Sequence, residues 1–483
     1  MSAKAESNAV NPNLNGKTKM SPSMKKAIWL VVAIAVYFII ISLPTPAGLK
    51  PVGQKAIALM VVAVIAWITE IVPIAISALV LTFMQHIIGT IAMGPAVQNF
   101  ANPTLLFVLS SFFLAAALTA SGLGKRLSMK LTILSKGSPK KVIFYLMAAT
   151  AVLSTVISDV PAAAAFAPIG LALIDKNNCK LKASNFAKSL MIGIPFAALI
   201  GGVATPAGSS LNVLSLSLLK STSKIDISFV QWASVGIPVV IIAIPLAWKI
   251  MTMVYPPEMD HLIGLEDVHK EYQEIGPFSK KEMKFLVIMI LLLITWFTES
   301  IHKVPLQASA TIGAALFFLP GIELLTWDTA KQKVGWDTIL LIGAASSLGT
   351  TLWTSGAATW IANSALTGIK GSSALMVILF VVVFTILIHL LVPVNPAIVS
   401  VMVPTLAAFA VAIGMNPAFL VIPMGFTVSA AFLLPLDPVP LMTYSSGHYT
   451  MGDYFKVGVP VCVMWTIVMT LAMMLLAGPL GLF

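Results

Sequence analysis

Long runs of apolar residues dominate the chain from residue 27 to its end, and short polar segments separate them. A helix needs about 20 mainly apolar residues to cross a lipid bilayer, and the runs recur at close to that length. We therefore predict an all-α polytopic membrane protein with about 11 transmembrane helices. The predicted spans are 27–43, 56–71, 73–89, 104–123, 189–219, 235–255, 285–298, 308–319, 336–361, 417–444 and 455–480.

Two further apolar stretches, about 142–174 and about 375–411, are interrupted in the middle by polar residues and proline. Lysines flank the first stretch on both sides, so the positive-inside rule places both of its ends in the cytoplasm. An ordinary proline kink would not return the chain to the same side. We therefore expect two re-entrant hairpins, whose irregular tips are tolerated only inside protein or beside water. The tips are Ser158-Asp159-Val160-Pro161 and Pro393-Val394-Asn395-Pro396.

The two halves of the sequence repeat the same features in the same order. By the predicted topology, the first copy of a Trp-x-Thr-Glu motif lies near the inner surface and the second near the outer one. Inverted repeats with interrupted helices are typical of secondary transporters. A channel or a membrane enzyme is the alternative, but no nucleophile–base pair, metal cluster or polar pore stripe supports it, so we do not expect an enzyme. The matching features are Trp67 to Glu70 with Trp296 to Glu299, Thr104 with Thr338, and Pro168 with Pro404.

Composition supports a division into four segments. Only 10% of residues are charged and 58% are hydrophobic, which leaves no room for a soluble domain. The net charge of +11 comes from lysines in the loops, and it indicates a cytoplasmic amino terminus and an outside carboxyl terminus in the cell (plasma or inner) membrane rather than nucleic-acid binding. We predict a disordered cytoplasmic tail (1–26), a first repeat (27–255), a cytoplasmic linker (256–284) and a second repeat (285–483).

No lysine or arginine lies in the middle of a predicted span, so an anion bound deep in the membrane must be held by other groups. The exposed N–H groups at the start of a half-helix carry partial positive charge and bind carboxylates. Ser158 and Asn395 can add side-chain hydrogen bonds. From the residues alone, the solute is small and polar.

The spans after each hairpin are also interrupted, at 201–212 and 434–441. Glycine and proline open the backbone there, and the freed carbonyls could hold a cation, although close helix packing would explain the glycines equally well. Asp159 and Asp437 lie in the interruptions, where each could bind a cation, take up a proton or cap a half-helix. For His389, before the second tip, we favour packing over a proton role.

These residues resemble the divalent anion/sodium symporter family, which includes dicarboxylate and citrate carriers and 2-oxoglutarate/malate translocators. The sequence from Trp67 to Pro73 is similar to the family's W-x-T-E-x-x-P signature, and the 201–212 stretch is similar to its glycine-rich break. The resemblance implies a scaffold and a moving transport domain, substrate carboxylates at the two hairpin tips, and a homodimer.

The tips differ from the Ser-Asn-Thr of sodium-coupled members, and oxygen ligands are lost around the second one. We therefore expect sodium-independent exchange of small dicarboxylates (malate, 2-oxoglutarate, fumarate and succinate), with weak or no sodium binding and no cofactor. The alternative is a sodium- or proton-coupled dicarboxylate or citrate symporter. Candidate substrate-binding residues are Ser158, Asp159, Val160, Ser209, Ser210, Asn212, Asn395, Pro396 and Pro438, and candidate coupling residues are Asp159, Thr205, Gly208 and Asp437.

Overall fold

The computed structural model describes residues 21–263 and 265–481, and the regular elements in those residues are all helical. Eight of these helices are long and apolar enough to cross a membrane, and several shorter apolar helices accompany them. The prediction of an all-α polytopic membrane protein is confirmed.

The first half of the chain contains two pairs of helices that meet at interruptions, α7 with α8 and α9 with α10. Proline starts α2, α5 and α7, where its missing N–H costs no helical hydrogen bond. The elements are α1 (Pro22–Ser42), α2 (Pro51–Thr69), α3 (Ile74–Ile87), α4 (Met93–Phe100), α5 (Pro103–Ser121), α6 (Leu123–Leu134), α7 (Pro139–Ile157), α8 (Asp159–Lys176), α9 (Asn185–Gly202), the 3-10 helix η1 (Pro206–Gly208), α10 (Ser210–Ser223) and α11 (Phe229–Val254).

The second half contains the corresponding interruptions, between α19 and α20 and between α21 and α22. Its elements are α12 (Leu265–Ile275), α13 (Lys280–Phe297), α14 (Glu299–His302), α15 (Leu306–Leu316), α16 (Trp327–Lys331), α17 (Trp336–Thr354), α18 (Ala357–Ala365), η2 (Thr367–Ile369), α19 (Ala374–Ile388), α20 (Asn395–Ala412), α21 (Pro417–Val428), α22 (Pro438–Tyr444) and α23 (Met451–Leu476).

Three local features differ from the sequence-based expectation. Helix α1 begins at Pro22, inside the range expected to be a disordered tail, because Ser21 caps it and the two lysines of its first turns are compatible with helix. Residues 1–20 of that tail lie outside the described residues. The expected linker contains α12 and the first turns of α13. Arg126, expected in a loop, lies in α6 and forms a buried ion pair with Glu282, with Nε to Oε1 at 2.5 Å.

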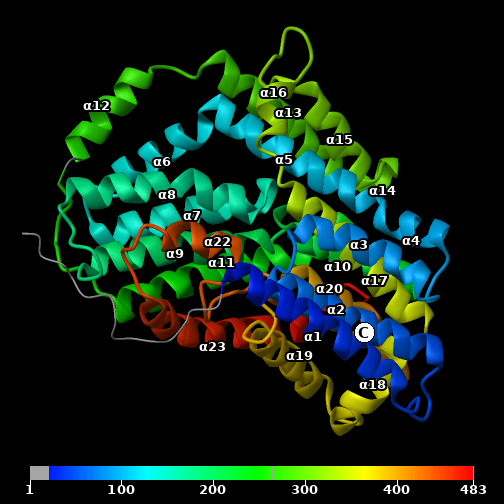
Figure 1. Cartoon of the computed structure of the whole chain (residues 1–483). Helices are drawn as coiled ribbons and strands as arrows, with labels where there is room; N and C mark the ends of the chain where they lie inside the picture. Colours follow the sequence, from blue (N-terminus) through cyan, green and yellow to red (C-terminus); the bar gives the residue numbers. More distant parts are fainter. Residues whose placement is uncertain (1–20, 264, 482–483) are drawn as a thin grey trace, which may run out of the picture.

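The two halves interlock around one large apolar core. Figure 1 shows the late helices α22 and α23 beside the early helices α8, α9 and α11. In the reverse direction, α10 of the first half packs against α20 and α21 of the second half. Each half-helix that follows a break therefore contacts a hairpin of the other half, which brings the two sets of interruptions together at the centre of the molecule.

Candidate functional site

The first hairpin turns at a single residue, Ser158, between α7 and α8. Its backbone has φ 77° and ψ 154°, a region that is essentially restricted to glycine and that costs a serine on the order of 1–3 kcal/mol. Residues held in such conformations cluster at functional sites, where the surrounding structure stabilises them. The strained backbone therefore marks this tip as a candidate binding element.

Asp159 follows Ser158 and is almost fully buried, with 8% of its surface exposed. Its Oδ1 accepts hydrogen bonds from the Val160 N–H at 2.9 Å and from the Ser158 hydroxyl at 3.1 Å. Its Oδ2 accepts a hydrogen bond from the Ser209 hydroxyl at 3.3 Å. This last bond joins the hairpin tip to the break between α9 and α10.

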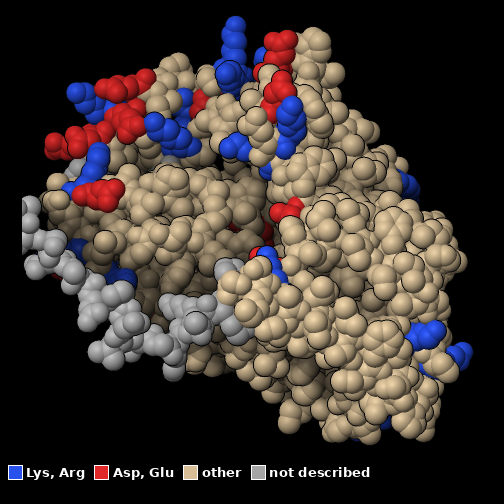
Figure 2. Space-filling view, in the orientation of Figure 1, with Lys and Arg blue, Asp and Glu red and all other residues tan. Residues whose placement is uncertain are grey.

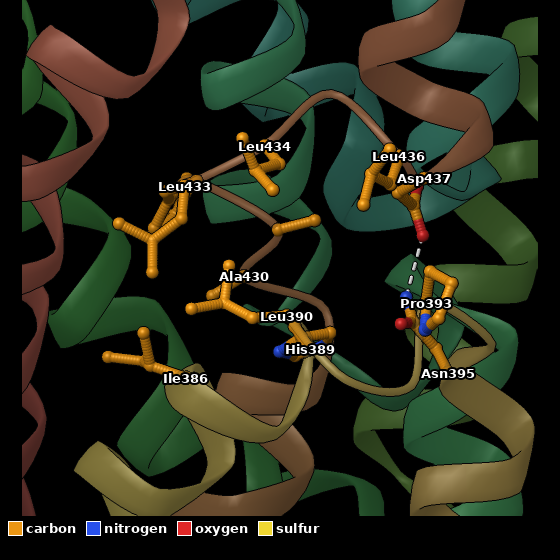
Figure 3. Close-up of a pocket in the computed structure, with 12 residues that line it drawn as sticks. Ile386, His389, Leu390, Pro393, Asn395, Ala430, Leu433, Leu434, Leu436 and Asp437 are labelled. Carbon is orange, nitrogen blue, oxygen red and sulfur yellow. Dashed lines mark hydrogen bonds between the residues drawn. The ribbon is translucent and has the colours of Figure 1, made fainter. Parts of the chain in front are cut away.

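The second hairpin is joined to its own break in the same way. The Asn395 amide Nδ2 at the start of α20 donates to Asp437 Oδ2 at 2.6 Å, and the Val439 N–H donates to Asp437 Oδ1 at 3.0 Å. Figure 3 shows Asn395 between Asp437 and His389. His389 Nε2 lies 2.7 Å from the Val428 carbonyl oxygen, at the end of α21. Each tip is therefore fastened to the break that follows it by one carboxylate.

The two carboxylates belong to helices in contact, because α22, which Asp437 caps, packs against α8, which begins with Asp159. Among the described residues, neither Asp159 nor Asp437 forms an ion pair with lysine, arginine or histidine. Groups of three or more metal-binding side chains are likewise absent from the described part of the chain. Two uncompensated carboxylates at the centre of a membrane protein are costly and indicate a functional site.

Other candidate residues brace the first break rather than face an open space. The fully buried Asn212 donates from Nδ2 to the Gly202 and Thr205 carbonyls at 2.8 and 2.9 Å, while its Oδ1 has no hydrogen-bond partner. The hydroxyl of Thr205 donates to the Thr155 carbonyl of α7. A Cβ atom on Gly208 would lie 2.3 Å from the Gly202 oxygen, so only glycine fits at that position.

The remaining candidates start half-helices. Val160 lies in the first turn of α8 and Ser210 is the first residue of α10; both are half-buried. Pro396 lies in the first turn of the other hairpin helix, and the exposed Pro438 begins α22.

Sequence reasoning missed the donors that satisfy carbonyls freed by the breaks. Trp232 Nε1 in α11 donates to the Val203 oxygen at 3.0 Å, and the Tyr454 hydroxyl in α23 donates to the Ala431 oxygen at 2.8 Å. One turn after each aromatic residue, Gly236 and Gly458 let break carbonyls approach, because a Cβ there would lie 2.5 and 1.9 Å from an oxygen. An aromatic residue followed one turn later by glycine, in the second helix after each break, is the signal that could have found them.

A cavity of about 690 Å³ lies along α8, between that helix and α5, α6 and α12. Val160 and Pro161 line it near the first tip, and Lys125, Lys176 and Glu271 line it at the far end of α8. The face in Figure 2 is hollowed near its middle, and charged side chains gather over α6 and α12. The first tip is therefore reachable through a space large enough for a small organic anion.

Known proteins resemble this chain along nearly its whole length. A membrane protein of Cupriavidus necator is 27% identical, over 90% of this chain and 89% of that protein. The sodium-dependent dicarboxylate transporter SdcS of Staphylococcus saprophyticus is 25% identical, over 96% and 94% of the two chains.

Solved structures share the fold. MtrF of Neisseria gonorrhoeae matches with a TM-score of 0.55 at 13% identity, over 95% of both chains. The YdaH transporter of Alcanivorax borkumensis matches with the same score and identity, over 93% of this chain and 97% of that one. At this level of identity the match concerns the fold alone.

The family model described as the sodium:sulfate symporter transmembrane region matches residues 24–483. That match confirms the predicted resemblance to divalent anion/sodium symporters and identifies a membrane transporter rather than an enzyme. The interrupted helix pairs, the paired tips and this full-length match lead to one conclusion: the chain belongs to the sodium:sulfate symporter family.

Proposed function

We propose that the protein is a cation-coupled symporter of small dicarboxylates. The observation that carries the proposal is the pair of carboxylates, Asp159 and Asp437, which fasten the tips to the breaks and have no cationic partner among the described residues. A dianion that approaches two carboxylates in a medium of low dielectric constant meets strong repulsion. A cation that enters with it removes that repulsion, so substrate and cation bind together.

The relatives favour symport over the exchange that the tip sequences suggested. The Staphylococcus proteins, 25% identical over more than nine-tenths of this chain, are named sodium-dependent dicarboxylate transporters. Sodium-independent exchange, our first prediction from the sequence, is therefore less well supported than its alternative.

The oxygen atoms at the first tip suit a hard cation. Asp159 contributes a carboxylate, and Ser158 and Ser209 contribute the hydroxyls that already contact it. The unpartnered Oδ1 of Asn212 adds a buried oxygen in the same break. We assign the coupling sodium ion to this cluster, although the altered tip argued for weak sodium binding.

The large cavity is the proposed route for substrate from the cytoplasm. Lys125, Lys176 and Lys333 line it together with Glu271, which pairs with Lys125 at 2.7 Å, so the lining keeps a net positive charge. Positive charge in a cleft raises the local concentration of anions. In this proposal both hairpins are re-entrant, the amino terminus is cytoplasmic and the carboxyl terminus is outside the cell membrane. The hairpins and broken helices move against a scaffold formed by the other spans, in a homodimer.

Uptake into purified proteoliposomes tests the proposal. Vesicles that contain no dicarboxylate should accumulate labelled succinate when sodium is added outside, because symport needs no internal substrate. Accumulation that requires internal dicarboxylate and ignores sodium would instead establish exchange. Potassium in place of sodium is the matched control, and a panel of unlabelled dicarboxylates, citrate and sulfate as competitors defines the substrate range.

A further inference from the structure

We propose that Asp437, Asn395 and His389 form a proton-binding site, which we call the second-half cluster, and that one proton crosses with each transport cycle there. The inference rests on the proposed function, because it assigns a second coupling ion to the same symporter. It assigns sodium to the first tip and the proton to the second, so that the two halves carry different ions.

The side chains around the second-half cluster suit a proton better than a metal ion. A small cavity of about 20 Å³ adjoins it, which is room for about one water molecule. Apart from Asp437, Asn395 and His389, the side chains that line this cavity are apolar. Only two side chains here carry oxygen, Asp437 and Asn395, against four at the first tip, so the first tip serves a hard cation better. One water molecule is nevertheless sufficient to deliver a proton.

Among the described residues, no charged or titratable group that faces Asp437 brings a positive charge that would oppose proton uptake. Asp159 at the start of α8 repels its negative charge. The Tyr454 hydroxyl of α23 is the second group, but it donates its hydrogen to the Ala431 oxygen and so does not stabilise the charge of Asp437. His389, at the end of α19, is the remaining group and carries no fixed positive charge. A proton bound at the cluster removes the repulsion between the carboxylates.

His389 is arranged to accept that proton. A carbonyl oxygen only accepts hydrogen bonds, so the contact with the Val428 oxygen requires Nε2 to carry hydrogen, which leaves the Nδ1 lone pair of a neutral imidazole free. Nδ1 is buried without a hydrogen-bond partner of normal geometry, although the ring lies near the Asn395 side chain. Only 9% of His389 is exposed, so this orphaned nitrogen is not satisfied by bulk water.

Asn395 connects the two titratable groups. Its Nδ2 donates to Asp437, which leaves its Oδ1 as an acceptor on the side of the imidazole. A proton that arrives as hydronium binds either the Asp437 carboxylate or His389 Nδ1 and leaves a water molecule behind, and no other bond changes. In both forms the Asp437–His389 pair has no net charge.

The experiment measures proton movement with sodium equal on both sides of the membrane. Proteoliposomes loaded with a pH-sensitive dye receive external succinate, at a pH above the second pKa of succinate, with the membrane potential clamped at zero. The wild-type lumen should acidify during uptake. Asp437→Asn should lose the acidification while retaining measurable succinate counterflow, which shows that the variant is folded. His389→Gln should lose most of the acidification with Asp437 still present.

Asp226→Asn is the matched control, because it makes the same chemical change at an exposed loop carboxylate paired with Lys220. It should acidify like the wild type. Sodium-driven uptake without acidification in the wild type, or acidification that survives in both Asp437→Asn and His389→Gln, would overturn the proton site while the symport proposal stands. Absence of succinate uptake under every gradient would overturn the proposed function itself.

Discussion

In the first half of the protein the carboxylate lies on the hairpin tip, at Asp159, and the break contributes the hydroxyl of Ser209. In the second half the positions are reversed, because the tip carries the amide of Asn395 and the break carries Asp437. Both halves use one acidic side chain to fasten tip to break. They differ in what surrounds it, since hydroxyls and an amide oxygen lie at the first site and apolar side chains with one histidine lie at the second.

The comparison separates residues that the broken backbone needs for its own hydrogen bonds from residues that can differ between the two halves. The second helix after each break, α11 or α23, supplies an aromatic donor and, one turn later, a glycine against the break carbonyls. These features satisfy buried carbonyl groups, which are costly when left unpaired, so both halves contain them. The hydrogen bonds of the Ser158, Asp159 and Asn395 side chains satisfy no break carbonyl, and there the halves differ.

The largest expected effect comes from the glycines that the two halves share. Gly458→Ala places a Cβ atom 1.9 Å from the Phe432 oxygen, and Gly236→Ala places one 2.5 Å from the Val203 oxygen. Overpacking of this kind costs about 1–3 kcal/mol or more. Both variants should melt at lower temperature in detergent, Gly458→Ala more so. Gly94→Ala, with open space around the new methyl group, is the control. Equal melting of all three would mean that the breaks are loosely packed.

The next largest effect tests whether sodium binds at Asp159 rather than at Asp437. Asp159→Asn should raise the sodium concentration needed for half-maximal uptake by about tenfold or more, which corresponds to about 1.4 kcal/mol, because it removes the only charged ligand from the first tip. Asp437→Asn should leave that concentration close to the wild-type value. Sodium titrations of initial uptake rates measure both. The reverse outcome, with sodium dependence lost only in Asp437→Asn, would exchange the roles of the two halves.

A smaller difference distinguishes the two bonds that fasten tip to break. The Asn395 amide donates to Asp437 at 2.6 Å, whereas the Ser209 hydroxyl donates to Asp159 at 3.3 Å. Hydrogen bonds to charged groups contribute about 1.5–3 kcal/mol, and long ones contribute less. Asn395→Ala should therefore lower the melting temperature more than Ser209→Ala. Ser445→Ala is the control for removal of a serine hydroxyl, because Ser445 is exposed and its hydroxyl makes only a local contact. A larger shift for Ser209→Ala would contradict this ranking.

The smallest effect concerns Ser158, the strained residue of the first tip. Glycine relieves the unfavourable backbone conformation and alanine does not, while both remove the hydroxyl that contacts Asp159. Ser158→Gly should therefore be more stable than Ser158→Ala by about 1 kcal/mol. Melting curves of the two variants measure this difference in stability, and because both variants lack the hydroxyl, its loss does not contribute to the difference. Identical curves would show that the tip is not strained.

Much of the architecture follows from local patterns. Apolar runs of spanning length predict helices wherever they occur, because a backbone in lipid must satisfy its own hydrogen bonds. The interruptions at Ser158 and near Asn395 are visible as polar residues and proline within such runs, and the structure ends helices there. Short helices such as α12 and α6 were missed, because charged residues conceal them from a search for apolar runs.

The sequence by itself determined the membrane-spanning class, the family and the approximate positions of the four interruptions, since each of these depends on residues adjacent in the chain. The last interruption was expected at 434–441 and begins earlier, because α21 ends at Val428 and α22 starts at Pro438. Only the tertiary structure decided which side chains meet. Residues far apart in the sequence form the Asn395–Asp437 and Asp159–Ser209 bonds and the bonds from Trp232 and Tyr454 to carbonyls of the breaks. Packing also decides that one nitrogen of His389 stays without a partner. Such contacts depend on how helices pack and on which polar groups remain unpaired after packing, and no local pattern carries that information.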